Sequence, residues 1–321
     1  MSNSTAVGGK QLRNAVMRHL LTLADLTSAE IDRIFSLTED LKSKFVKGLR
    51  EPLLPGRVMA MLFEKQSLRT RVSFEAGMAH LGGTAMFLGD DVGFGKRESM
   101  ADFGRVLSEF VDVIVARTKR HQMVVDLANY CSCSVINGLT DLAHPCQAMA
   151  DLYTLHELVG RLAGHTLAWV GDGNNVARSL AIGCGKVGMR MVMATPEKYR
   201  FHPEFLDFLG REVPELDLEV TSNPIEAVGD AVAVYTDVWA SMGQEKEREL
   251  RRRDFAGYQV NAELMSHTQK GAVFLHCLPA RRGEEVTNDV IDSPQSVVVE
   301  QAANRMHVQK GILAWLLAAK A

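Results

Sequence analysis

Short apolar runs alternate with stretches of helical spacing along most of the chain. The first half contains four apolar runs that we expect to be buried strands: 58–63, 85–88, 113–116 and 134–137. Helical spacing occurs between and after these runs, near 70–81, 99–110, 121–130 and 146–158. Runs that are apolar throughout and separated by helices are typical of a parallel sheet covered on both faces.

The second half repeats this alternation. Its predicted strands are 166–170, 191–194, 218–221, 231–236, 273–276 and 296–299, and they precede a helical stretch at about 301–319. Gly160 and Gly164 follow a long predicted helix, so we expect a domain boundary near 150–162. We therefore predict the α/β class, with two doubly wound parallel-sheet domains and a site in the cleft between them.

Before the first strand, Thr27 and Glu30 have the spacing of a capping box, which predicts a helix over about 28–47.

Composition agrees with two globular domains and excludes several classes of protein. The chain has 321 residues, 46% of them hydrophobic and 23% charged, which is ordinary for a folded two-domain protein. Lys and Arg total 36 against 39 Asp and Glu, so no basic surplus points to nucleic acid or to an anionic membrane surface. No apolar run approaches the roughly 18 residues that a membrane-spanning helix needs.

The N-terminus and the cysteines favour the cytoplasm. The first ten residues lack the apolar core of a signal peptide. The cysteines are odd in number and scattered, which is typical of free thiols in a reducing compartment: Cys131, Cys133, Cys146, Cys184 and Cys277. Cys131 and Cys133 have the wrong spacing for a zinc knuckle, so no metal site is predicted.

Polar residues gather directly after the predicted strands, at the sheet edge where ligands bind in parallel α/β folds. The segment 67–71 opens a predicted helix, whose free amides suit a phosphate. Arg69 adds a planar donor fork, and Ser67 and Thr70 add hydroxyl donors. The alternative interpretation is a helix cap flanked by solvated arginines.

Four further residues of this kind lie beyond that segment. Pro145 suits a first helical turn, which places His144 at the helix start and Gln147 one turn in. An imidazole there can donate a hydrogen bond to a carbonyl oxygen, whereas the alternative is a structural cap. Arg117 ends a predicted strand and Arg305 lies in the last helix. Each arginine, taken alone, is equally compatible with the protein surface.

The polar residues of the second half predict a binding site for an amino acid rather than for a dinucleotide. The segment 171–175 is rich in glycine, but Val176 stands where a third glycine is required, and no acid ends the next strand. Asn175 can both donate and accept hydrogen bonds. Asp237 ends a strand and leads into the loop of Ser241, a combination that suits a zwitterionic ligand.

Two other segments have ordinary interpretations. The charged stretch 245–254 mixes glutamates with arginines, which predicts a solvated helix face. His276 and Cys277 are adjacent at a strand end, and successive strand side chains point to opposite faces. A catalytic pair of thiol and imidazole is therefore not expected there.

Taken together, four segments resemble the ornithine carbamoyltransferase family: 67–75, 144–147, 237–243 and 276–279. The likeness extends over about 15–318. It implies a carbamoyl-phosphate-binding domain at 1–150, onto which a C-terminal helix at about 302–321 packs, and an ornithine-binding domain at 151–301. It also implies a homotrimer with no metal and no organic cofactor.

The resemblance implies carbamoyl transfer from carbamoyl phosphate to L-ornithine, in arginine biosynthesis. The implied carbamoyl phosphate site comprises Ser67, Leu68, Arg69, Thr70, Arg117, His144, Gln147, Cys277, Leu278 and Arg305. The implied ornithine site comprises Asn175, Asp237, Ser241 and Met242. The implied catalytic groups are Arg69, Arg117, His144 and Cys277. Transfer to another amine, such as N-acetylornithine or putrescine, is the alternative.

Two positions depart from the family's usual pattern. Leu68 replaces a threonine, which removes a hydroxyl but keeps the backbone amide at the helix start. Gly93 stands near the place where relatives often carry a Gln or His that reaches the phosphate site of a neighbouring subunit. The sequence therefore also admits a paralogue that has kept the fold and lost catalysis.

Overall fold

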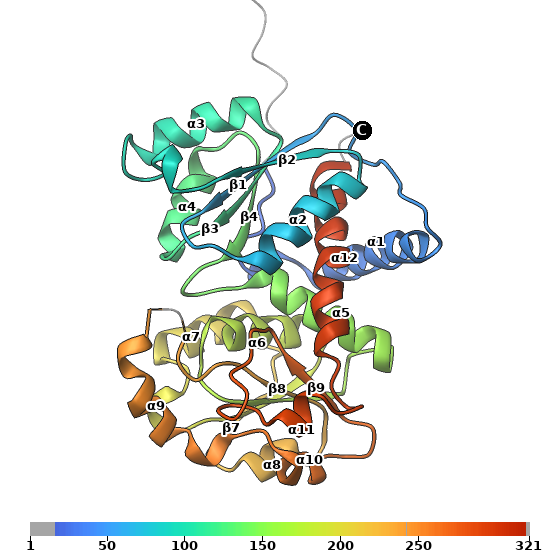
Figure 1. Ribbon diagram of the computed structural model, residues 1–321, viewed down its shortest axis with the longest axis vertical. Coiled ribbons are helices and arrows are strands. Elements are labelled where there is room, and N and C mark those ends of the chain that lie inside the picture. Colours follow the sequence, from blue (N-terminus) through green and yellow to red (C-terminus); the bar gives the residue numbers. More distant parts are fainter. Residues whose placement is uncertain (1–16, 242, 319–321) are drawn as a thin grey trace, which may run out of the picture.

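The computed structural model describes residues 17–241 and 243–318. Two parallel sheets, one from each half of the chain, are flanked by helices and lie one above the other in Figure 1. The predicted α/β class with two doubly wound sheets is confirmed. Met242, a predicted site residue, lies outside the described residues, as do 1–16 and 319–321.

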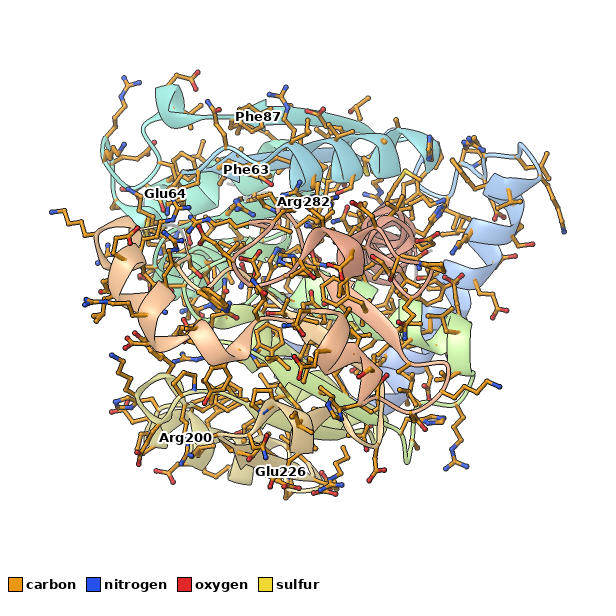
Figure 2. All side chains as sticks on the ribbon, turned by 60° about the horizontal axis from the view of Figure 1, so that its bottom comes forward. Phe63, Glu64, Phe87, Arg200, Glu226 and Arg282 are labelled. Atoms are coloured by element: carbon orange, nitrogen blue, oxygen red, sulfur yellow. The ribbon has the colours of Figure 1, made fainter. Side chains whose placement is uncertain are left out.

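The first sheet has the strand order β2-β1-β3-β4. Its strands are β1 (Val58–Phe63), β2 (Thr84–Leu88), β3 (Val113–Arg117) and β4 (Ser134–Leu139). The helices of this half are α1 (Ser28–Val46), α2 (Leu68–His80), α3 (Met100–Phe110), α4 (His121–Tyr130) and α5 (Pro145–Val159), with short 3₁₀ turns η1 (Leu23–Asp25) and η2 (Asp90–Val92). Phe63 packs edge-on against Phe87 of the neighbouring strand, with ring centres 5.4 Å apart (Figure 2).

The second sheet has the order β7-β6-β5-β8-β9. Its strands are β5 (Thr166–Val170), β6 (Arg190–Ala194), β7 (Leu218–Thr221), β8 (Ala231–Thr236) and β9 (Val273–His276). Its helices are α6 (Asn175–Val187), α7 (Pro203–Glu212), α8 (Pro224–Val228), α9 (Arg248–Asp254), α10 (Ala262–Ser266), α11 (Asn288–Ile291) and α12 (Val298–Leu317), with 3₁₀ turns η3 (Glu197–Tyr199), η4 (Glu245–Glu247) and η5 (Ala256–Tyr258).

The predicted strand at 296–299 is wrong. Ser296 makes a single bridge to Phe274, and α12 already begins at Val298. The valines of this run suit a strand by side-chain type, but the amide of Gln301 donates to the Val297 carbonyl at 2.8 Å and starts the helix. The other predicted strands and the capping box of Thr27 are confirmed.

Helix α12 joins the two halves. It contacts β9 at one end and packs against α1, α2 and α5 along its length (Figure 1). Gly311 permits the close approach to α1, because a Cβ there would lie 2.3 Å from Thr38 Oγ1. The buried apolar cluster is therefore continuous from Ile34 of α1 to Tyr235 of β8.

The cysteines and the helix lengths also bear on the predictions from the sequence. The five cysteines are all free thiols, as predicted. Among the described helices, none is long and apolar enough to span a lipid bilayer.

Cationic and imidazole side chains surround Phe45 where α1, α2 and α12 meet. Arg50 Cζ lies 3.9 Å from the ring centre and Lys310 Nζ lies 5.1 Å from it. The rings of His80 and His307 lie 5.3 and 5.0 Å away. Burial, and then the charge of Lys310, lowers the pKa of His307 to about 3. His307 is consequently neutral in the folded protein near neutral pH.

Acidification should therefore destabilise this junction. The unfolded chain protonates His307 near its ordinary pKa of about 6.5, whereas the folded protein resists protonation down to about pH 3, so protons favour unfolding in that window. We expect His307 alone to lower the free energy of unfolding by roughly 1–2 kcal/mol between pH 7.5 and 5. His307→Phe keeps the ring against Phe45 and should flatten that part of the profile. Urea unfolding at several pH values measures this, and an unchanged slope contradicts it.

Candidate active site

A cleft of about 940 Å³ lies at the carboxyl ends of the strands of both sheets. The loops after β1, β3 and β4 line one side, and those after β5, β8 and β9 line the other. The chain runs outward in opposite directions from the neighbours β1 and β3, and likewise from β5 and β8. The cleft therefore faces the switch point of each sheet, where open α/β folds bind ligands.

Most of the predicted site residues line this one cleft. They are Ser67, Leu68, Arg69, Arg117, His144, Gln147, Asn175, Asp237, Ser241, Cys277, Leu278 and Arg305. Thr70 is fully buried and does not line the cleft. Its hydroxyl instead accepts hydrogen bonds from Arg117 Nη1 at 3.4 Å and Arg305 Nη2 at 3.0 Å, and so holds both guanidinium groups.

The start of α2 faces the cleft as the sequence predicts. Ser67 is the N-cap, and its hydroxyl accepts from the Thr70 amide at 3.3 Å. The following amides belong to the first helical turn, where they have no partner within the helix. Arg69 reaches the cleft from the same turn. This helix start can therefore bind an anion through both its amides and the helix dipole.

Arg69, Arg117 and Arg305 bring three positive charges together. Arg117 and Arg305 are buried, and the Nε atom of each lacks a hydrogen-bond partner among the described residues. None of the three arginines pairs with a carboxylate of the described residues. Burial, then the charges of Arg305 and Arg69, lowers the pKa of Arg117 to about 10. A negatively charged ligand would offset the repulsion among these three cations, so the cluster is suited to binding an anion.

His144 and Gln147 stand beside the arginines at the start of α5. His144 is the N-cap, Pro145 occupies the first turn, and the His144 amide donates to Ser179 Oγ at 2.8 Å. Burial, reinforced by the three arginines, holds the pKa of His144 well below its ordinary value. The imidazole is therefore neutral, and one nitrogen can donate a hydrogen bond to a ligand oxygen. Gln147 Oε1 accepts from Arg305 Nη1 at 3.0 Å.

Across the cleft, Asp237 is the centre of a polar cluster. Its carboxylate accepts hydrogen bonds from Asn174 Nδ2 at 2.8 Å and from the thiol of Cys277 at 3.1 Å. Desolvation, and then the charge of Asp237, raises the pKa of Cys277 well above its ordinary value, so the sulfur stays a neutral donor. Asn175 donates to the Thr140 carbonyl at 2.7 Å. The contact of Asn174 with Asp237 was not predicted, although its place before the helix is typical of an N-cap.

His276 and Cys277 are closer than strand alternation predicts. A nitrogen of His276, the sulfur of Cys277 and an oxygen of Asp237 all lie within 4.8 Å of one another. Strand β9 ends at His276, and Leu278 has a φ of 57°, so the chain turns before alternation applies to Cys277. Both nitrogens of His276 are engaged, one by the Leu278 amide at 2.9 Å and the other facing Glu285 at 3.1 Å.

The prediction that the stretch 245–254 is a solvated helix face is wrong at Arg251. Its side chain is buried and pairs with Asp172 at 2.7 Å. It also donates to the Trp239 carbonyl at 2.9 Å and lies over the ring of Tyr199, 4.7 Å from its centre. Arg251 thus fastens the start of the loop that follows β8 to the loop that follows β5. Composition alone does not separate this arginine from its exposed neighbours.

Comparison with known proteins decides the family. The carbamoyl-P binding domain model of aspartate/ornithine carbamoyltransferases matches residues 18–157, and the Asp/Orn binding domain model matches 163–316. The chain belongs to the aspartate/ornithine carbamoyltransferase family. An ornithine carbamoyltransferase of Carboxydothermus hydrogenoformans is 50% identical over 303 residues, which cover 94% of this chain and 97% of that protein.

Solved members of the family share the fold closely. The ornithine carbamoyltransferase structure from Pyrococcus furiosus is 48% identical, with a TM-score of 0.91 over 95% of this chain and 98% of that one. The curated protein from the same organism is named an anabolic ornithine carbamoyltransferase. An anabolic enzyme structure from Campylobacter jejuni is 34% identical, with a TM-score of 0.88 over 94% of this chain and 99% of that one.

The structure gives a local reason for one departure from the family pattern. Gly93 has a φ of 68°, and a Cβ there would lie 2.2 Å from Arg97 Cδ. Any side chain at this position would be strained and would displace Arg97. Leu68, the other departure, is 75% exposed.

Inorganic phosphate should stabilise the folded protein through the arginine cluster. At 100 times its dissociation constant the expected gain is about 2.7 kcal/mol. Arg117→Met should lose most of this stabilisation by phosphate. Without phosphate, the variant should unfold at the same temperature as the parent or a higher one, because one of three mutually repelling charges is gone. Thermal unfolding with phosphate or with chloride at equal ionic strength measures both effects. Equal stabilisation of both proteins by phosphate contradicts the assignment.

Proposed function

We propose that this protein transfers the carbamoyl group of carbamoyl phosphate to the δ-amine of L-ornithine, giving L-citrulline and phosphate for arginine biosynthesis. The observation that carries the proposal is the cleft itself, in which three arginines that pair with no carboxylate of the described residues face the carboxylate of Asp237. The similarity to proteins named ornithine carbamoyltransferase over almost the whole chain supports it.

Carbamoyl phosphate would bind on the side of the first sheet. Its phosphate fits the start of α2, between the Leu68 amide, the hydroxyl of Ser67 and the guanidinium groups of Arg69 and Arg117. Arg305 would hold the phosphate as it leaves. Thr70 would contribute by keeping Arg117 and Arg305 in place.

The carbonyl oxygen of the carbamoyl group gains negative charge in the transition state. The neutral imidazole of His144 and the guanidinium of Arg117 would stabilise that charge. One preorganised donor of this kind contributes roughly 2.7–4 kcal/mol in comparable sites. Gln147 and the carbonyl of Leu278 would accept hydrogen bonds from the carbamoyl NH₂.

Ornithine would bind on the side of the second sheet. Asn175 and the Met242 amide would hold its α-carboxylate, while Asp237 and Ser241 would hold its α-ammonium. Its δ-amine has an ordinary pKa of about 10.4, so deprotonating the amine at pH 8 costs roughly 3.3 kcal/mol. A cleft that excludes water lowers that cost. Cys277 and Asp237 would orient the amine, and the departing phosphate would take its proton.

The same proposal extends to domains, assembly and location. We assign carbamoyl phosphate binding to residues 1–150 with 302–321, and ornithine binding to 151–301. We also propose a homotrimer, supported by apolar side chains exposed on α2 and on the edge strand β2: Leu68, Val72 and Met86. Five free thiols suit the reducing cytoplasm.

Citrulline formation tests the function directly. Purified protein with carbamoyl phosphate and L-ornithine should produce citrulline and phosphate in equal amounts. N-acetylornithine and putrescine serve as competing acceptors and should give little product. Turnover with one of them but not with ornithine contradicts the proposal.

Asp237→Asn should damage the use of ornithine and spare carbamoyl phosphate binding. The new amide places a donor against Asn174 Nδ2 or against Cys277, which both donate to the native carboxylate. We expect kcat/KM for ornithine to fall by roughly 100-fold, because an unpaired buried donor costs about 1–3 kcal/mol and an attraction for the α-ammonium is also lost. Steady-state kinetics in each substrate provides the measurement.

Arg69→Ala is the matched variant on the other side of the cleft. It should weaken carbamoyl phosphate binding and reduce turnover, while leaving the polar cluster of Asp237 intact. If kcat/KM for carbamoyl phosphate and kcat/KM for ornithine fall to the same extent in both variants, the division of the cleft into two binding sides is contradicted.

A further inference from the structure

Asp151 is a buried carboxylate to which neither the sequence motifs nor the proposed mechanism gives a role. It lies on α5, one turn beyond Gln147, and is fully buried. Oδ1 accepts from Gln147 Nε2 at 2.8 Å and from Gln301 Nε2 at 2.6 Å. Oδ2 accepts from the hydroxyl of Tyr235 at 3.1 Å. Helices α5 and α12 and strand β8 therefore converge on this one side chain.

All three partners of Asp151 donate to it. Burial raises the pKa of Asp151 to about 7, whereas the three donors and the charge of Arg305 oppose that rise. A protonated carboxyl group needs an acceptor for its own hydrogen. The ionised form satisfies all three donors at once, whereas a protonated Oδ2 would need the Tyr235 hydroxyl to turn and accept.

Asp151 fixes which end of the Gln147 amide faces the cleft. With Gln147 Nε2 directed at Asp151, Oε1 is directed at Arg305 Nη1, at 3.0 Å. A carbonyl oxygen has a second lone pair, which remains available to an NH₂ group of a ligand. If the amide turned over, its NH₂ would meet both the donor of Arg305 and the donors of the ligand.

A second connection leads from Asp151 to the turn after β9. Gln301 donates to Asp151, and its Oε1 accepts from the backbone amide of His276 at 2.9 Å. The turn that begins there carries Leu278, whose amide donates to the ring of His276 at 2.9 Å. One carboxylate thus orients Gln147 directly and holds the backbone that leads to Leu278.

We propose that Asp151 is a positioning residue that makes the site selective for a transferred group bearing an NH₂. Gln147 and the Leu278 carbonyl are the two acceptors assigned to the carbamoyl NH₂, and both depend on Asp151 for their orientation. The inference rests on the proposed function. The phosphate cradle at Ser67 and Arg69 shares no hydrogen bond with Asp151, and Arg305 is linked to Asp151 through Gln147. A phosphate ligand without an NH₂ group therefore measures how far the loss of Asp151 reaches phosphate binding.

Acetyl phosphate separates positioning from a purely structural role. It carries the same phosphate and carbonyl as carbamoyl phosphate, with a methyl group in place of the NH₂. Asp151→Leu fills a similar volume but removes every acceptor. We expect its kcat/KM for carbamoyl phosphate to fall roughly 10- to 100-fold, the cost of about one or two misplaced hydrogen bonds. The inhibition constant of acetyl phosphate should change less than about threefold.

Two further variants complete the test. Asp151→Asn can keep an oxygen toward Gln147 and Gln301, because the Tyr235 hydroxyl can turn to accept from the new NH₂, so it should restore most of the selectivity. Tyr235→Phe removes a hydroxyl that contacts Asp151 and Gln301 but not Gln147, and because Gln301 keeps its own bond to Asp151 the ratio of the two constants should stay near that of the parent. If circular dichroism shows that Asp151→Leu does not fold, Asp151→Ser replaces it, since its shorter side chain cannot reach Gln147.

The outcomes are distinct. Selective loss for carbamoyl phosphate in Asp151→Leu or Asp151→Ser, with recovery in Asp151→Asn, supports the inference. Equal weakening of carbamoyl phosphate and acetyl phosphate assigns Asp151 a structural role only, and unchanged selectivity also overturns the inference. Absence of citrulline formation by the parent protein refutes the proposed function instead.

Discussion

Repulsion among Arg69, Arg117 and Arg305 is the constraint on which the rest of the structure depends. Two of these guanidinium groups are buried, and no described carboxylate pairs with any of the three. The packing around them must hold the charges together against both desolvation and mutual repulsion. A small anion with several oxygens relieves both costs at once, which ties the stability of this region to its ligand.

The fold meets this constraint with elements that are distant in sequence. Arg69 comes from the start of α2, Arg117 from the end of β3 and Arg305 from α12. Thr70 supplies one oxygen to two of them. The network of Asp151 lies directly behind Arg305 and Gln147 and places a negative charge where it screens the cluster without occupying the cleft. Gln147 and Arg305 therefore connect the carboxylate that orients the amide to one edge of the arginine cluster.

The sequence predicts most of the scaffold because its strands are apolar on both faces and its helices carry strong start signals such as Thr27. It also predicts the residues that follow strands, since parallel strands end at a common edge. It fails where a role depends on tertiary partners. Arg251 resembles its exposed neighbours until Asp172 is placed beside it. Asp151 follows Gln147 by one turn, but its partner Gln301 lies 150 residues away.

Local chemistry explains the remaining differences. The run at 296–299 has strand-like side chains, yet the helix takes its last two residues because the Val297 carbonyl already has a helical partner. Asn174 and Asn175 are adjacent and identical in type, and only the N-cap position of Asn174 turns its side chain toward Asp237.

The chain crosses between the two sheets at α5 and again at α12, and these helices pack against each other. A single crossing would leave the halves free to swivel about it, whereas two adjacent crossings confine their relative motion to bending about a line through both. Gln147 of α5 and Arg305 of α12 are hydrogen-bonded to each other at 3.0 Å, so they would keep their relative position as the cleft narrows. The acceptor proposed for the carbamoyl NH₂ would thus belong to the part of the cleft that both crossings brace.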